Sequence, residues 1–454
     1  MTSRLPVVIV LPALARAASA LASELSRFAG EHPECSLDAL ENAVLGALRT
    51  AAPALLAATL AGSHRRLQDT SVAPPPRCPQ CHQPAAVHDW RPRTLQTRAG
   101  PLQFARPWAQ CGPCGHGFSP TDTALGLAGP QRLSAGLRQL LVALGGETSF
   151  RAAARLLTQT TGLVVSAETV RSVTEAAGAV ALAQQAQQAA HVAQTATAPA
   201  PHAPAPDQLV AEADGVMVRF QDGWHEVKVG VVGGWDTVAA QQGPAPHLQA
   251  PSYVALRGQP AVFGAQWGAE AARRGAVDVV GWYGRGNRLA RLRHAVVIGD
   301  GAAWIWEQAA AQFGDRTEIV DFYHACEHLT TVAGLLAGVG SAAATAWATA
   351  RREELRSQGV AAILPHLATP TGLDAGAAAK LRTERGYFSG NAARMQYPAF
   401  RAAGLPIGSG AVESSARHVI QQRLKRAGAR WSDAGGQVMV ALRAQHATQL
   451  AQAA

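Results

Sequence analysis

The chain has 454 residues, enough for about two to four domains, at least one of them with a full hydrophobic core. Lys and Arg (40) outnumber Asp and Glu (31), so the net charge is +9 at pH 7 and the pI is about 9.7. This balance favours a polyanionic partner such as DNA, RNA or an acidic membrane. No run of about 18 uninterrupted apolar residues occurs, so we predict no transmembrane helix.

The N-terminal region, residues 1–73, has a helical pattern. Arg4 precedes an apolar run over residues 5–14 that mimics a weak signal peptide. Two prolines interrupt this run, and export would expose paired cysteines to oxidation. We therefore expect an unexported helical region, with Leu37–Leu60 as one amphipathic helix that is broken near Pro53.

Two Cys-x-x-Cys pairs follow the Pro74–Pro76 boundary and define residues 74–120 as a zinc ribbon. Paired thiolates of this kind give a tetrahedral sulfur site suited to a structural Zn²⁺ ion, and four thiolates leave no open position for catalysis. Nucleic-acid contact by the ribbon is one interpretation, and a purely structural staple is the other. The ligands would be Cys78, Cys81, Cys111 and Cys114, and the nucleic-acid contacts Arg91, Arg93, Arg98 and Arg106.

Residues 130–180 are typical of a helix-turn-helix DNA-binding module. Thr148–Leu157 has helical apolar spacing, Thr161–Leu163 supplies a turn, and Ser166 caps a second helix that presents Thr169 and Arg171. The alternative is an ordinary pair of packed helices. Residues 181–206 are rich in Ala, Gln and Pro; their first half can extend a helix, and the second half is a semi-rigid linker.

The second half of the chain predicts an α/β fold with a mixed sheet, antiparallel at its start and parallel at its end. A hairpin turn at residues 221–223 joins the first two strands. After Asp321 the pattern is helical to about Ala403, and again from Val412. The predicted strands are Leu209–Phe220, Trp224–Trp235, Ser252–Leu256, His294–Ile298 and Thr317–Val320, and the predicted helices between them are Ala261–Arg274 and Ala302–Phe313.

Three acidic residues stand in settings that favour metal binding. Asp214 lies within an apolar strand, where an isolated charge is costly to desolvate, and Asp300 ends another strand. Glu413 lies in the first turn of a helix, after a glycine-rich turn, where the helix dipole favours the ionised form. Ionised carboxylates are the ligands that Mg²⁺ prefers. Taken singly, each residue could instead be a solvated turn or cap.

Four segments resemble DDE-type transposases of bacterial insertion sequences, specifically the ISKra-like group with an N-terminal zinc ribbon. The segments are Glu212–Gly215, Gly299–Trp306, Ile319–Leu329, and Pro406–Ser415 together with Gln422–Trp431. The resemblance implies an RNase H-like core over residues 207–330 and 406–454, with a helical insertion over 331–405. It further implies that Asp214, Asp300 and Glu413 are the catalytic triad.

The implied activity is metal-dependent cleavage and strand transfer of insertion-sequence ends. Two Mg²⁺ or Mn²⁺ ions, roughly 3.5–4 Å apart, would activate the attacking oxygen and stabilise the leaving oxygen. The implied partners are double-stranded DNA with terminal inverted repeats, target DNA and further copies of the chain, with no membrane; the location is the bacterial cytoplasm, associated with the nucleoid. The rival functions are an RNase H-like nuclease or resolvase without strand transfer, and a non-catalytic DNA-binding regulator.

Asp321-Phe-Tyr-His324 resembles the D-x-x-H element of related transposases, so His324 is a candidate for orienting a scissile phosphate or a ligand carboxylate. The alternatives are an Asp321 helix cap with His324 and His328 stacked, or a zinc site that includes Cys326. The basic segment before Trp431 is predicted to hold DNA backbone near the metals, or to be a solvated face with Trp431 packed. Its candidate contacts are Arg417, Arg423, Lys425, Arg426, Arg430 and Trp431.

Overall fold

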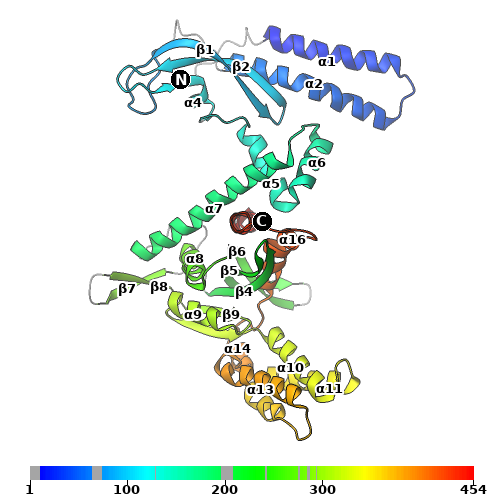
Figure 1. The fold of residues 1–454 in the computed structure, drawn as a ribbon, viewed down its shortest axis with the longest axis vertical. Helices are drawn as coiled ribbons and strands as arrows, with labels where there is room; N and C mark the ends of the chain where they lie inside the picture. The colour runs from blue at the N-terminus through cyan, green and yellow to red at the C-terminus, as the bar shows by residue number, and fades with distance from the viewer. Residues whose placement is uncertain are drawn as a thin grey trace. The chain divides into compact units, whose positions relative to one another are not determined.

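The chain divides into two compact units, Met1–Val173 and Thr174–Ala454, and the boundary falls within one long helix, α7 (Ala167–Thr195) (Figure 1). The computed structural model describes residues 11–63, 74–127, 129–195, 208–240, 243–274, 277–283, 287–292 and 294–453. The apolar run at residues 5–10 and the linker at 196–206 lie outside the described residues, whereas the preceding stretch, residues 181–195, is helical.

The first unit begins with two packed helices, α1 (Leu11–Glu31) and α2 (Leu37–Ser63). The expected break at Pro53 does not occur. α2 continues past this residue, although a proline inside a helix removes one backbone hydrogen bond. Within the described residues, α2 is the one helix that could cross a membrane by length and composition. A single helix of this kind is weak evidence for a span, so the absence of a transmembrane helix stays a prediction.

A three-stranded antiparallel sheet follows, formed by β1 (Ala86–Thr97), β2 (Gly100–Gln110) and β3 (Gly117–Phe118). Thr97 pairs with Gly100 across a tight hairpin turn, where the φ of +104° at Gly100 favours glycine. The short helix α4 (Pro120–Ala124) contacts β2. Its Asp122 accepts hydrogen bonds from Arg93 Nη1 and Arg106 Nε, each at 2.6 Å, so these arginines fasten the sheet to α4.

Three helices share a small apolar core after the ribbon: α5 (Ala135–Glu147), α6 (Phe150–Thr161) and the start of α7. Gly162 ends α6 in the left-handed conformation, and the Ser166 hydroxyl accepts from the Thr169 amide at the start of α7. The predicted two-helix unit and its caps are therefore present. Its use in DNA recognition remains a prediction.

The second unit is built on a five-stranded mixed sheet with the order β10-β9-β4-β5-β6. The antiparallel strands are β4 (Leu209–Phe220), β5 (Gly223–Ala240) and β6 (Gly243–Leu256), and the parallel strands that extend from β4 are β9 (Ala295–Gly299) and β10 (Arg316–Val320). This arrangement confirms a mixed α/β fold with an antiparallel start and a parallel end. A further two-stranded ribbon, β7 (Val277–Tyr283) and β8 (Asn287–Leu292), is absent from the sequence prediction.

Helices cover the large sheet and shield its edge. α8 (Pro260–Arg273) and α9 (Ala303–Gln312) pack together beside the sheet, and α8 contributes the buried Trp267 (Figure 1). Along the edge strand β6, the backbone amides of Tyr253 and Arg257 donate to Thr448 and Gln437 of α17 (Asp433–Ala453). Edge groups that would otherwise be free to pair with another strand are thus used within the chain.

Between β10 and the C-terminal helices the chain forms a helical insertion (Figure 1). α10 (Phe322–Ala337) leads into it, and its further elements are α11 (Ala342–Gln358), α12 (Val360–Ile363), η2 (Leu364–Leu367), α13 (Ala375–Gly390), η3 (Ala392–Arg394) and α14 (Tyr397–Ala402). After it come α15 (Gly410–Ser415), the π-helical turn η4 (Ala416–Gln421) and α16 (Gln422–Leu424).

Candidate active site

Asp214 and Asp300 lie side by side on neighbouring strands. Ala213 of β4 pairs with Gly299 of β9 in the parallel ladder, and each aspartate is the next residue in its strand direction. Both are half-buried, and each accepts a hydrogen bond from a nearby backbone amide, Asp214 from Gly215 at 2.7 Å and Asp300 from Ala302 at 2.8 Å. Strand pairing therefore brings these two predicted site residues together.

The pKa of Asp214 is raised, mainly by burial and further by the neighbouring Asp300. Burial raises its pKa to about 6, the Gly215 amide opposes the shift, the Asp300 charge adds to it and the His324 charge lowers it. A cation between the two carboxylates would relieve their repulsion, and carboxylate oxygens suit Mg²⁺ or Mn²⁺. Asp214 and Asp300 are thus two neighbouring carboxylates of the donor type that such an ion prefers.

Glu413 is exposed on α15, a short helix that contacts β4 and β5. The preceding glycine-rich turn is held by two buried acids from the core. Glu212 Oε2 accepts from the Val412 amide at 2.7 Å, and Asp321 Oδ2 accepts from the Ser409 amide at 2.6 Å and from the Ser409 hydroxyl. These contacts fix the start of α15 against β4 and the end of β10.

The side chain of Glu413 does not complete a tight cluster with the two aspartates. Within the described part of the chain, the four ribbon cysteines are the only group of three or more potential ligands within 4.8 Å of one another. His324, Cys326 and His328 do not form such a group. Asp214 and Asp300 are thus assembled in this structure, whereas Glu413 is presented by a neighbouring helix.

Glu212 is the site residue that the sequence interpretation missed. It lies two positions before Asp214 on β4, is 2% exposed, and burial raises its pKa to about 8; the amides of Val412 and Ala411 lower the pKa and Asp321 raises it. The signal was present, since a glutamate inside the run Leu209–Ala213 is an acid in a buried strand.

His324 lies in the first turn of α10, close enough for its charge to act on Asp214. Asp321 caps this helix by accepting from the His324 amide at 2.9 Å, and the rings of His324 and His328 meet edge to face at 4.9 Å. The alternative of an Asp321 helix cap is therefore observed, and the two histidines are in contact but edge to face, not stacked. It is compatible with a role of His324 beside the aspartates.

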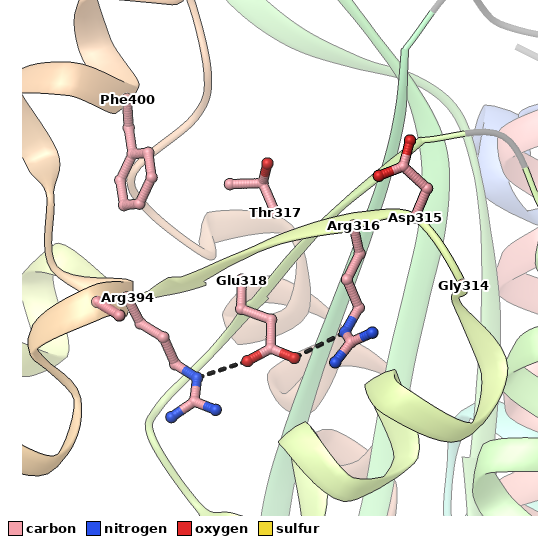
Figure 2. Close-up of a pocket in the computed structure, with 8 residues that line it drawn as sticks. Gly314, Asp315, Arg316, Thr317, Glu318, Arg394 and Phe400 are labelled. Atoms are coloured by element: carbon pink, nitrogen blue, oxygen red, sulfur yellow. Dashed lines mark hydrogen bonds and ion pairs between the residues drawn. The ribbon is translucent and has the colours of Figure 1, made fainter.

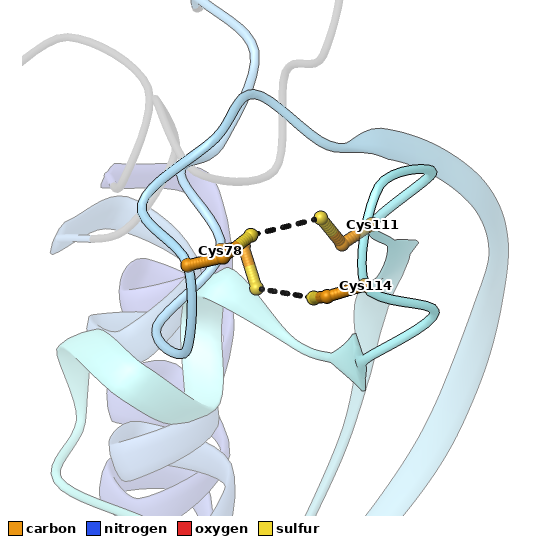
Figure 3. A group of neighbouring side chains, drawn as sticks. Cys78, Cys111 and Cys114 are labelled. Atoms are coloured by element: carbon orange, nitrogen blue, oxygen red, sulfur yellow. Dashed lines mark hydrogen bonds between the residues drawn. The ribbon is translucent and has the colours of Figure 1, made fainter.

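The four ribbon cysteines converge on one point from two turns (Figure 3). The Sγ atoms of Cys78 and Cys114 lie 3.6 Å apart, and those of Cys81 and Cys111 lie 3.4 Å apart. Tetrahedral Zn²⁺ with a Zn–S length of about 2.3 Å requires sulfur separations of about 3.8 Å, so the cage is close to the required size. The cysteines could therefore bind a structural metal such as zinc.

The sequence of the chain matches one known family. Residues 81–335, more than half of the chain, match UPF0236, described as an uncharacterised protein family. The chain belongs to this family. No match was found among curated proteins. The matched region of this UPF0236 member spans most of the ribbon and the strands that carry Asp214 and Asp300.

The predicted DNA contacts separate into exposed and buried groups. Arg417, Lys425, Arg426 and Arg430 are exposed in this UPF0236 member. Arg423 and Trp431 are 3% and 7% exposed; the guanidinium lies 4.7 Å from the indole, and Trp431 Nε1 donates to the Leu424 carbonyl. For Arg423 and Trp431, packing replaces the expected DNA contact.

The candidate contacts of the first unit are also used within the chain. Arg171 bonds Glu168 on the exposed face of α7, and the Thr169 hydroxyl lies 2.9 Å from that of Ser166. In the ribbon, Arg93 and Arg106 are held by Asp122, which supports the staple interpretation for these two residues. Arg91 remains half-exposed, stacked 4.2 Å from the centre of the Trp108 ring.

A pocket of about 560 Å³ lies beside β10 (Figure 2). Its central acid, Glu318, accepts from Arg316 Nε at 2.7 Å and from Arg394 Nε at 2.6 Å, so its charge is matched within the pocket. The pocket lies at the first residues of β10, whereas Asp214 and Asp300 follow the pair Ala213 and Gly299 at the other end of the parallel ladder. It is therefore separate from the candidate active site.

Proposed function

We propose that this protein is a DNA transposase of the DDE type, which cleaves and joins the ends of an insertion sequence in a metal-dependent reaction. The observation that carries the proposal is the pair Asp214 and Asp300, which follow paired residues of the adjacent parallel strands β4 and β9, with α15, the helix that carries Glu413, packed against β4. Carboxylates at this edge of an open α/β sheet are placed for chemistry. The mixed strand order also supports an RNase H-like core.

In this proposal Asp214, Asp300 and Glu413 would hold Mg²⁺ or Mn²⁺, which would supply activation of the attacking oxygen and stabilisation of the leaving oxygen. The chain's own residues set the geometry. The strand ladder fixes the two aspartates, and Glu212 and Asp321 hold the turn before Glu413. His324, whose charge acts on Asp214, would orient a phosphate.

DNA would be held by positive side chains near this centre. The exposed basic residues after Glu413 are Arg417, in the π-helical turn η4, and Lys425, Arg426 and Arg430, in the loop that follows α16. Phosphate contacts of this kind position a duplex without reading its sequence. Sequence recognition is assigned to the first unit, where the α6–α7 pair presents Thr169 and Arg171 and the ribbon presents Arg91.

The test uses purified protein and a labelled duplex that carries the repeat found beside its gene, with Mg²⁺ or Mn²⁺. Wild type is compared with Glu413→Gln and, as a matched control, Glu353→Gln, an exposed glutamate on α11. Cleaved and joined products from wild type and Glu353→Gln only are expected. Cleavage without joining would indicate a nuclease or resolvase, binding without cleavage a DNA-binding regulator, and equal cleavage by all three proteins a wrong third carboxylate.

A further inference from the structure

A chain of three side chains in contact, Glu384, His328 and His324, runs from the helical insertion toward the candidate active site. Glu384 of α13 is 2% exposed, and its Oε2 lies 2.5 Å from His328 Nδ1. His328 Nε2 lies 3.3 Å from His324 Nε2, and the His324 charge acts on Asp214. A glutamate this deeply buried occurs only with partners, and here one partner is a histidine directed at the active site.

The hydrogen bonds fix which nitrogen of each ring carries a proton. Burial raises the pKa of Glu384, but hydrogen bonds from Lys380 and His328 outweigh it and keep the pKa below its ordinary value, so the carboxylate is ionised and can only accept. His328 Nδ1 therefore donates to Glu384. In neutral His328, Nε2 is then an acceptor, and His324 must donate to it from its own Nε2. The other ring nitrogen of His324, Nδ1, lies 3.5 Å from Oε2 of the exposed Glu327.

Tyr387 binds the same helix to the aspartate turn. It lies one turn after Glu384, stacks on the His328 ring with centroids 3.8 Å apart, and donates from its hydroxyl to the Asp300 carbonyl at 2.8 Å. Gly301 accommodates the tyrosine, because a Cβ added there would lie 2.7 Å from the ring. The insertion thus contacts both the histidine pair and the backbone of a candidate ligand.

We infer that Glu384, acting through His328, is a positioning residue for His324 and makes the helical insertion part of the active centre. This inference rests on the proposed function. It assigns a role to the helical insertion, which supplies none of the three candidate metal ligands. Glu384 acts as the acid behind a catalytic histidine does: it selects the tautomer and holds the ring in place.

The test compares wild type with Glu384→Gln, which keeps an acceptor oxygen but removes the charge, with Glu384→Ala, and with the control Glu353→Gln. Nitrogen-15 NMR of the imidazole rings, in protein free of metal and DNA, reports the tautomers. We expect a single tautomer for His324 and His328 in wild type and the control, and tautomer mixtures in both Glu384 variants. Glu384→Gln guards against an alanine variant that fails to fold.

The single-turnover rate constant of strand cleavage is measured beside the dissociation constant for the DNA end. In Glu384→Gln we expect the rate constant to fall by about 10- to 100-fold, as for carboxylates that orient metal-bound histidines, with DNA binding unchanged. Unchanged imidazole spectra, or altered spectra with a wild-type rate constant, would overturn the inference. If wild type cleaves no DNA, the proposed function fails, and the spectra alone then decide whether Glu384 sets the tautomers.

Discussion

At the scale of single residues, this protein places acids where burial opposes their charge. Glu212 and Asp321 are each less than a tenth exposed. One oxygen of each accepts from a backbone amide just before Glu413, and the other oxygen of Asp321 caps α10. A buried acid costs stability unless it is neutralised or hydrogen-bonded. The protein therefore keeps two costly acidic side chains in its core, and these two side chains hold the backbone that presents a third acid, Glu413.

Glu212 leads to a prediction about stability and pH. Its folded-state pKa is raised from 4.5 to about 8, so the folded protein binds more protons than the unfolded chain between these values. The free energy of unfolding should therefore fall as pH rises from about 5 to 8. Glu212→Gln keeps an acceptor for the Val412 amide but cannot ionise, so it should remove this loss.

Urea denaturation of both proteins at pH 5, 6, 7 and 8 checks the prediction. Relative to wild type, Glu212→Gln should gain up to a few kcal/mol between pH 5 and 8, since one pKa unit corresponds to about 1.4 kcal/mol. Comparing the two proteins cancels the smaller change of the same sign that Asp214 contributes at lower pH. Parallel pH curves would show that Glu212 does not titrate in this range.

At the scale of elements, local pattern predicted the strands that carry the site. β4 has the predicted bounds, β9 lies one residue later than predicted, and β10 begins one residue earlier, because continuous β-branched runs between turns identify buried strands. Asp214 and Asp300 could be proposed as neighbours from their places after such runs. The β7–β8 ribbon was missed because Gly281 and the charged residues at 288 and 291 interrupt any apolar alternation.

The residues that support the site were not predictable from local pattern. Glu212 bonds a residue 200 positions away, and His328 bonds Glu384 56 positions away, so nothing near them in sequence identifies their partners. Arg423 and Trp431 looked like surface residues of a basic helix. The π-helical turn at Ala416–Gln421 rotates the following residues relative to a regular helix, which is one reason why Arg423 faces inward.

At this scale we predict that the zinc ribbon depends on its metal for stability. Its buried core, apart from the cysteines, is small, so the sheet should depend on its metal. We expect about one Zn²⁺ per chain in wild type and none in Cys78→Ser/Cys111→Ser, whose β1–β2 hairpin should become sensitive to protease. The control Cys35→Ser, outside the cage, should keep its zinc and its resistance. Equal zinc content in all three proteins would contradict the site.

At the scale of the whole molecule, the net charge of +9 does not by itself show which positive groups could bind a polyanion, because some of them are bonded within the chain. Several arginines are used internally: Arg93 and Arg106 bind Asp122, Arg394 binds Glu318, and the buried Arg443 donates to the Val419 carbonyl of the π-helical turn at 2.7 Å. Such residues add to the formal charge but cannot hold a phosphate without leaving their partners. The exposed basic residues after Glu413 are therefore the ones expected to set the affinity for a polyanion.

Salt dependence separates these two classes of arginine. Each phosphate neutralised by Lys or Arg contributes about 0.9 to the slope of log affinity against log salt, so changing Arg417, Lys425, Arg426 and Arg430 to Gln should reduce the slope by about 3 to 4. The control removes the same charge from the helical insertion, at Arg356, Arg382, Arg385 and Arg401, all of which are exposed. It should weaken binding slightly through the long-range field and leave the slope nearly unchanged. Equal loss of slope in both variants would mean that DNA is attracted by the net charge of the protein as a whole and that no particular surface beside Glu413 holds it.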